Sequence, residues 1–263
     1  MIDSAPRHVV ITGASAGIGR ALAMAYAQPG VVLGIVGRND VQLEATATAC
    51  RVRGAQVIVG AIDVRESGSI CAWLYDFDDQ YPIDLLIANA GIASTLSSAS
   101  DWENLDRTTT VVDTNFYGAI HTVLPVIDRM RVRRHGHIAM VASIAALRGM
   151  AISPAYCASK SAIKAYADSV RSLLKRDGVR MSVILPGFVK TSMSDVFPGD
   201  KPFMWTADRA AAYIRRKLDA RRAEIAFPGL LAFGMRILAL LPITLADAIL
   251  DKLSYLPGKE DPN

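Results

Sequence analysis

Short apolar runs alternate with longer helical stretches along most of the chain. The apolar runs are continuous and rich in β-branched residues, which is typical of strands buried on both faces of a parallel sheet. They lie at 9–12, 31–36, 56–61, 85–88, 137–142, 181–185 and 224–227. Helical stretches separate them at 40–53, 66–80, 105–134, 154–176 and 207–220. The alternation predicts a single doubly wound α/β domain over residues 1–263, with a Rossmann core of about seven parallel strands at 8–227.

The last third of the chain departs from this alternation. Residues 191–205 contain the turn Pro198-Gly199-Asp200 and predict either a long irregular loop or a short-helix excursion, which would serve as a substrate lid. An apolar helical extension follows at 228–256, with two stretches, 230–241 and 245–253, separated by Pro242. Helices this apolar need burial, and three explanations stay open: they cover the substrate pocket, join a subunit interface or lie on a membrane surface.

Composition narrows the class of protein. The chain has 263 residues, of which 51% are hydrophobic and 21% charged, so it is expected to form a compact core. Three scattered cysteines without a CxxC pair favour a reducing compartment, and no uncharged apolar run is long enough to span a bilayer. We therefore expect a cytoplasmic protein, with peripheral membrane contact left open.

Two further features bear on metals and nucleic acids. His135 and His137 flank Gly136, where we expect a solvated turn rather than a metal site, so no metal is predicted. The basic clusters at 129–134 and 215–222 have no aromatic residues for base stacking, and the net charge is only +4. A solvated helix face explains these clusters, and no nucleic-acid partner is expected.

A glycine-rich turn follows the first apolar run. The segment Thr12-Gly13-Ala14-Ser15-Ala16-Gly17-Ile18-Gly19 precedes an alanine-rich helical stretch. Strand, glycine turn and helix can bind a pyrophosphate, because bare backbone permits close approach and the helix N-terminus supplies N–H donors. The spacing G-x-x-x-G-x-G differs from the commonest dinucleotide fingerprint, G-x-G-x-x-G. The segment predicts a dinucleotide site, with a tight structural turn as the alternative.

A tyrosine and a lysine lie four residues apart in a predicted helix, as Tyr156 and Lys160. Residues i and i+4 lie on one helix face, so the two side chains are expected to be neighbours. A nearby ammonium favours the phenolate and lowers the tyrosine pKa from its ordinary value of about 10. The pair suits a general acid or base, although the same spacing also arises by chance on exposed helices.

Taken together, the motifs resemble those of the short-chain dehydrogenase/reductase family, in its single-domain branch with Tyr-x-x-x-Lys. The similarity runs from about residue 8 to 227 and joins motifs that are modest alone. In chain order they are the turn at 12–19, Asn89-Ala90-Gly91, Asn115, Ser143, Tyr156 with Lys160, Pro186-Gly187 and Thr191. One departure is visible: Ala88 precedes Asn89, where the family often has a second asparagine.

The resemblance implies a catalytic set of four residues. Tyr156 would exchange a proton with the substrate oxygen, and Ser143 would hydrogen-bond that oxygen. Lys160 would lower the tyrosine pKa and bind the nicotinamide ribose, and Asn115 would hold a water that links Lys160 to solvent. The resemblance also implies a homodimer or homotetramer, built through the helices that carry Asn115 and Tyr156.

The resemblance also implies a set of cofactor-binding residues. Asn89 and Gly91 would place backbone near the adenosine ribose, Asp63 would meet the adenine, and the segment after the sixth strand would contact the nicotinamide. The full set is Gly13, Ser15, Ala16, Gly17, Ile18, Gly19, Arg38, Asp63, Val64, Asn89, Ala90, Gly91, Tyr156, Lys160, Pro186, Gly187, Val189 and Thr191.

The end of the second strand bears on the choice of cofactor. An acidic residue there would favour NAD, but Gly37 occupies that position and Arg38 follows it. A guanidinium can pair with a 2′-phosphate, and the Ser15 hydroxyl could add a contact, so NADP is favoured over NAD. Asp40 is interpreted as the N-cap of the next helix.

These observations predict an NADPH-dependent oxidoreductase that reduces a ketone or aldehyde, or runs the reverse alcohol oxidation. The apolar extension and the aromatic residues of 188–205 favour an apolar substrate, although the same residues could simply pack the lid and core. A 3-oxoacyl-thioester reductase is an alternative within the enzyme class. A dinucleotide-binding sensor without turnover is the alternative outside it, and the presence of Ser143, Tyr156 and Lys160 argues against that reading.

Overall fold

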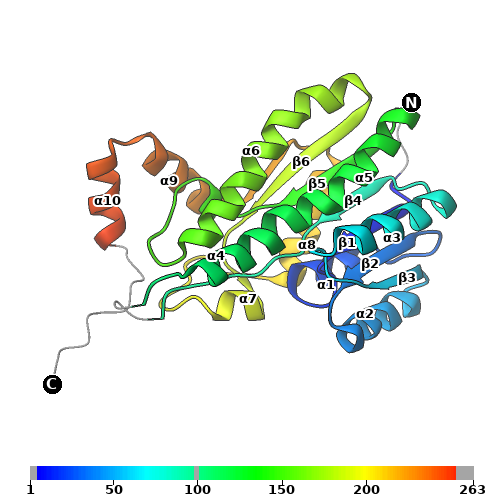
Figure 1. Ribbon diagram of the computed structural model, residues 1–263, viewed down its shortest axis with the longest axis horizontal. Helices are drawn as coiled ribbons and strands as arrows, with labels where there is room; N and C mark the ends of the chain where they lie inside the picture. The colour runs from blue at the N-terminus through cyan, green and yellow to red at the C-terminus, as the bar shows by residue number, and fades with distance from the viewer. Residues whose placement is uncertain (1–4, 98–100, 253–263) are drawn as a thin grey trace.

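The computed structural model describes residues 5–97 and 101–252, and a parallel β-sheet forms its centre (Figure 1). The seven strands are ordered β3-β2-β1-β4-β5-β6-β9 and every neighbouring pair is parallel. They are β1 (His8–Thr12), β2 (Val32–Gly37), β3 (Gln56–Ala61), β4 (Leu85–Ala88), β5 (Gly136–Val141), β6 (Val179–Pro186) and β9 (Glu224–Phe227). The predicted doubly wound sheet is confirmed, with strand ends shifted by at most two residues.

Helices cover both faces of the sheet (Figure 1). One face packs against α1 (Gly17–Tyr26), α2 (Asp40–Val52) and α8 (Ala207–Asp219), through a core that includes Leu22, Leu43 and Ile214. The other packs against α3 (Ser67–Gln80), α5 (Gly118–Arg133) and α6 (Pro154–Arg176), through a core that includes Leu74, Val123 and Ile163. Because both faces are covered, the strands are buried as continuous apolar runs.

Two helix starts differ in detail from the prediction. Asn39, not Asp40, is the N-cap of α2: its Oδ1 accepts a hydrogen bond from Gln42 N at 2.9 Å, and Asp40 is the first helical residue. The predicted helix at 105–134 is divided into α4 (Leu105–Val112), a π-helical turn η1 (Asp113–Tyr117) and α5. A single π-helical turn within a longer helix is frequently found at a functional site.

The expectation of a solvated turn at 135–137 is wrong for His137. Its side chain is partly buried, and Nε2 lies 2.7 Å from Ser182 Oγ, which in turn donates to Arg222 O. Burial, helped by the charges of Arg180 and Arg221, lowers the pKa of His137 to about 4. The imidazole is therefore neutral at pH 7 and acts as part of a buried hydrogen-bond chain.

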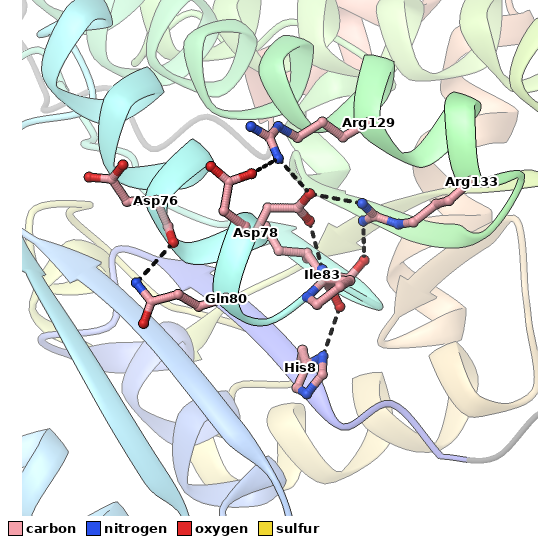
Figure 2. Close-up of polar contacts among 9 residues, drawn as sticks. His8, Asp76, Asp78, Gln80, Ile83, Arg129 and Arg133 are labelled. Carbon is pink, nitrogen blue, oxygen red and sulfur yellow. Dashed lines mark hydrogen bonds and ion pairs between the residues drawn. The ribbon is translucent and has the colours of Figure 1, made fainter.

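An ion-pair cluster joins α3 to α5, the two neighbouring helices on one face of the sheet (Figure 2). Asp78 is buried, accepts a hydrogen bond from Ile83 N at 2.7 Å and pairs with Arg133 at 2.9 Å and Arg129 at 3.4 Å. Arg133 also donates to Ile83 O at 2.7 Å. The cluster fixes the end of α3 and the loop that enters β4, whose far end carries Asn89.

Shorter elements follow the central sheet. They are the 3₁₀ turn η2 (Ile144–Ala146), the paired strands β7 (Val189–Lys190) and β8 (Trp205–Thr206), and α7 (Ser192–Asp195). The segment 191–205 is thus a short-helix excursion, one of the two forms that the sequence predicts for it.

The chain ends in two apolar helices, α9 (Gly229–Leu240) and α10 (Ile243–Lys252), drawn in orange and red at one end of the molecule in Figure 1. They are separated at Pro242, as the sequence predicts, and residues 253–256 of the predicted extension lie outside the described residues. Within 5–97 and 101–252, none of the helices combines the length and apolar character needed to cross a membrane.

Candidate active site

The carboxyl ends of the parallel strands open into one cavity of about 1260 Å³. Ligand sites in open α/β sheets lie at this edge, and a site for one small ligand typically measures about 300–1000 Å³. The cavity therefore has room for a dinucleotide together with a second molecule. Of the residues predicted from the sequence, all except Gly19 and Asn115 line it.

The glycine turn forms one wall of the cavity. Gly13 has φ +67°, and a Cβ there would lie 2.8 Å from Ala90 Cα, so the turn packs directly on the loop after β4. Gly19 supports the turn from behind, because a Cβ there would lie 2.2 Å from Gly13 O. Helix α1 begins at Gly17 with no side-chain cap, so its first N–H groups remain available to an anion in the cavity.

Asn89 joins the glycine turn to the loop after β4. Its Nδ2 donates to Thr12 O at 2.9 Å and Gly13 O at 3.3 Å. Its own N–H and that of Ala90 donate to Thr12 Oγ1 at 3.1 and 3.2 Å. The Asn89 side chain thus serves the turn, and the backbone at 89–91 lines the cavity.

The loops after β2 and β3 bring charged groups to the same cavity. Asp63 accepts from Arg65 N at 3.0 Å and pairs with Arg65 Nη2 at 2.8 Å, while Arg38 Nη1 lies 3.6 Å away. Burial acts to raise the pKa of Asp63, but hydrogen bonds from Arg65 and the two guanidinium charges outweigh it and lower the pKa. Arg65 therefore satisfies the carboxylate, and the Arg38 side chain stays 55% exposed.

Gly37 lies beside the Ser15 hydroxyl. A Cβ at Gly37 would lie 3.3 Å from Ser15 Oγ and 3.5 Å from Leu43 Cδ1. A side chain at this position would require Ser15 to shift by a few tenths of an ångström, so the strand end that commonly carries a carboxylate is crowded here.

The candidate acid–base residues meet between β5 and the start of α6. Tyr156 is in the first turn of α6 and is buried next to Ser143, the residue that precedes η2. Ser143 Oγ accepts from Ala145 N at 3.1 Å and donates to Pro186 O at 3.3 Å. Lys160 Nζ donates to Val141 O at 3.0 Å and lies 5.8 Å from the centre of the Tyr156 ring.

Burial controls the protonation of this pair. Burial raises the pKa of Tyr156 to about 12, and a hydrogen bond with Ser143 offsets only part of the rise. Burial also lowers the pKa of Lys160 to about 8. The i, i+4 spacing predicts a lowered pKa for Tyr156, and this lowering is absent. The rise in pKa caused by desolvation outweighs any lowering by the Lys160 ammonium, which is bound to a backbone carbonyl.

Asn115 lies behind the cavity wall, within the π-helical turn. Its Oδ1 accepts from Ile92 N at 2.7 Å, and its Nδ2 donates to Ile92 O at 3.0 Å and Ser159 Oγ at 2.9 Å. A Cβ at Gly91 would lie 2.9 Å from Asn115 Oδ1 and 3.3 Å from Lys160 Nζ, so these three residues are in close contact. Asn115 thereby fixes the loop after β4 against α6.

Apolar side chains line the side of the cavity next to Tyr156. Phe197 packs edge-on against Tyr156 at 5.7 Å between ring centroids, and Phe188 packs against Phe197 at 6.2 Å. Helices α9 and α10 also line the cavity, which supports the first of the three explanations for the extension. The sequence did not identify Ile92, Met150 and Ile152 as lining residues, because each lies in a loop whose path only the fold defines.

The sheet order and the glycine turn after the first strand define a dinucleotide-binding Rossmann fold. A model of the family described as short chain dehydrogenase matches residues 7–201. The chain therefore belongs to the short-chain dehydrogenase/reductase family and is an oxidoreductase of that family, which uses nicotinamide dinucleotides.

Similar proteins agree with this assignment. An uncharacterized oxidoreductase of Myxococcus xanthus is 33% identical over 255 residues, which cover 96% of this chain and 100% of that protein. The 3-oxoacyl-[acyl-carrier-protein] reductase FabG of Chlamydia pneumoniae is 29% identical over 204 residues, 76% of this chain and 80% of that protein. A crystal structure of an alcohol dehydrogenase from the archaeon Thermococcus sibiricus, complexed with 5-hydroxy-NADP, matches with a TM-score of 0.74 and 24% identity, covering 84% of this chain and 95% of that one.

Proposed function

We propose that the protein reduces a ketone or aldehyde with an apolar substituent, using NADPH, or runs the reverse oxidation of the alcohol. The observation that carries this proposal is the cavity itself. Tyr156, Ser143 and Lys160 lie between a glycine-turn wall with Arg38 and an apolar wall with Phe188 and the C-terminal helices. A dinucleotide and a hydrophobic substrate would therefore meet at the acid–base residues.

The residues of the chain would divide the acid–base work. The nicotinamide, when bound, supplies a hydride to the carbonyl carbon, and the products are the alcohol and NADP⁺. Tyr156 would donate the proton that the carbonyl oxygen needs, and the Ser143 hydroxyl would hydrogen-bond that oxygen. Lys160 lies close to Gly91 and Asn115, which supports a role for Lys160 in holding the nicotinamide ribose. Protons would then reach Lys160 through the π-helical turn that carries Asn115.

Arg38 would select NADPH. Its guanidinium lies at the cavity wall, half exposed, while Arg65 satisfies the neighbouring Asp63. A planar guanidinium suits a 2′-phosphate, and Ser15 lies beside Gly37, close to the same place. The residues from Gly13 to Ile18, Val64, Asn89 to Gly91, and Pro186 to Thr191 would hold the remainder of the cofactor.

The segment 191–205 would act as the substrate lid. Val196 O accepts a hydrogen bond from Thr95 Oγ1 at 2.9 Å, so the segment lies against the loop after β4, and Phe197 covers Tyr156. A homodimer or homotetramer and a cytoplasmic location stay predictions. Light scattering coupled to gel filtration measures the first of these directly.

A 3-oxoacyl thioester is the second candidate substrate. The similarity to a 3-oxoacyl-[acyl-carrier-protein] reductase supports it, and the apolar wall of the cavity suits an acyl chain. The comparison that separates the two is turnover of an acetoacetyl thioester against turnover of the corresponding simple ketone.

The test of the proposed function is NADPH consumption over a panel of linear aldehydes, ketones and 3-oxoacyl thioesters. Tyr156→Phe should lower kcat by about 10²- to 10⁴-fold, the usual contribution of a general acid, while the Kd for NADPH changes little. Tyr166→Phe, on the same helix and absent from the cavity wall, is the matched control. Full activity in Tyr156→Phe would refute the assignment.

A further inference from the structure

Beyond the acid–base residues, the cavity extends to the C-terminal helices α9 and α10. We call this part of the cavity the tail channel, and we define it by Leu231, Gly234, Met235 and Leu238 of α9 with Ile249 and Leu250 of α10. All six residues are uncharged and, apart from glycine, carry hydrocarbon or thioether side chains. The channel therefore offers no partner for a charged or strongly polar group.

One charged residue of each helix forms an ion pair away from the cavity. Arg236 of α9 pairs with Glu224, and Asp247 of α10 pairs with Arg148 at 2.5 Å. The second pair anchors α10 to the loop after η2. Both ion pairs hold the helices against the body of the protein, and none of the four residues lines the cavity.

The channel is elongated along α9. Leu231, Gly234 or Met235, and Leu238 follow the spacing i, i+3 or i+4, i+7, which places them on one helix face. At a rise of 1.5 Å per residue this stripe is about 10 Å long. A long apolar wall of this kind suits a linear hydrocarbon chain.

Gly234 leaves open space within this stripe. A Cβ built at Gly234 meets no atom within 4 Å, although the residue lies in the wall of the cavity between Leu231 and Leu238. Glycine within a helix costs about 1 kcal/mol relative to alanine, so the position is not explained by helix stability. Gly234 is exposed where it lines the cavity, so a side chain placed there would enter open space at the mouth of the channel without displacing its neighbours.

We propose that the tail channel binds the linear hydrocarbon tail of the carbonyl substrate, and that Gly234 determines how long a tail can enter. This inference rests on the proposed function and deepens it, because it names both the substrate class and a specificity-determining residue. The carbonyl would lie at Tyr156, and the tail would run from there along α9 toward Ile249.

The test is a chain-length profile of kcat/KM, with NADPH, over linear aldehydes from butanal to dodecanal. Each buried methylene contributes about fourfold in affinity, so kcat/KM should rise by about two- to fourfold per added carbon until the channel is full. Gly234→Leu adds a four-carbon side chain to the channel. It should lower kcat/KM for the longest substrates by about 50-fold or more and leave butanal within about twofold.

Ala239→Leu is the matched control, since Ala239 is exposed on the same helix and does not line the cavity. Leucine is a better helix former than glycine, so Gly234→Leu should fold at least as well as the parent. Fluorescence of cis-parinaric acid, a linear polyene fatty acid, gives a second readout that needs no turnover. Its binding to the cofactor-free protein should weaken in Gly234→Leu and not in Ala239→Leu.

The possible results separate this inference from the proposed function. Turnover that is independent of chain length, or that is highest for cyclic ketones, refutes the tail channel and leaves the carbonyl reductase standing. An equal loss for all aldehydes in Gly234→Leu also refutes it, because the residue would then act on catalysis rather than on tail length. Absence of turnover with every carbonyl refutes the proposed function, and parinaric acid binding then tests the channel alone.

Discussion

Replacing Arg38 with glutamine tests the proposed cofactor selectivity most directly. Arg38 lines the cavity after β2, and its guanidinium lies 3.6 Å from Asp63, whose carboxylate makes its closer pair with Arg65 at 2.8 Å. Glutamine keeps much of the length of the side chain and removes the charge. The variant should therefore bind NADPH more weakly and bind NADH as the parent does.

The size of the effect follows from the exposure of the side chain. A hydrogen bond to a charged group contributes about 1.5–3 kcal/mol, and the 55% exposure of Arg38 favours the lower end of that range. A loss of about 1.5 kcal/mol corresponds to a roughly tenfold rise in the Kd for NADPH. Arg38→Asp should give a larger shift, because it places a second carboxylate near Asp63 and near the 2′-phosphate.

The assay is a fluorescence titration with NADPH and NADH in parallel, at one ionic strength. Arg51→Gln is the control, since Arg51 is an exposed arginine on α2 that pairs with Glu44 and does not line the cavity. An equal rise in the Kd for both cofactors would show that Arg38 supports the fold of the site and does not bind the 2′-phosphate. An unchanged ratio in both Arg38 variants would show that another group holds the phosphate.

Two further predictions concern stability. Asp78→Ala should lower the free energy of unfolding, measured in urea, by about 2–3 kcal/mol. This is less than for a fully buried pair, because the side chains of Arg129 and Arg133 stay 31% and 24% exposed. Replacing the exposed Asp76 of the same helix with alanine should change that free energy by less than about 0.5 kcal/mol, and equal effects of the two substitutions would contradict the reasoning. His137, with its pKa lowered to about 4, binds a proton more readily when unfolded, so stability should fall as pH decreases from about 6.5 to 4. His137→Gln should flatten that slope, whereas a slope unchanged from the parent would assign it to other groups.

The sequence predicts the sheet well because each strand carries its own signal. The β-branched run at 9–12 is buried on both faces, and the glycine turn after it leads into the uncapped start of α1. The π-helical turn at 113–117 could not be predicted this way. Its extra residue per turn leaves little trace in the hydrophobic spacing of the helix, yet it orients Asn115 toward Ile92 and Ser159.

The protonation state of Tyr156 and Lys160 also could not be predicted without the fold. The i, i+4 spacing correctly makes Tyr156 and Lys160 neighbours, but the balance between charge and desolvation depends on how deeply α6 is buried. Helix α9 shows a related limit, since it is apolar on both sides. The sequence alone does not distinguish Leu231 and Met235, which line the cavity, from Phe233 and Leu240, which are exposed.

The position of these elements along the chain suggests how the site is divided. Loops after β1 to β4 form the proposed cofactor wall, and β5 with α6 carries the acid–base residues, all within the residues 7–201 that match the family model. The tail channel comes from α9 and α10, which lie after that match. Arg38 and Gly234 are contributed by different walls of the cavity, so their effects should be independent. Cofactor choice and substrate length could then change separately, because the residues that determine them lie on opposite sides of Tyr156 along the chain.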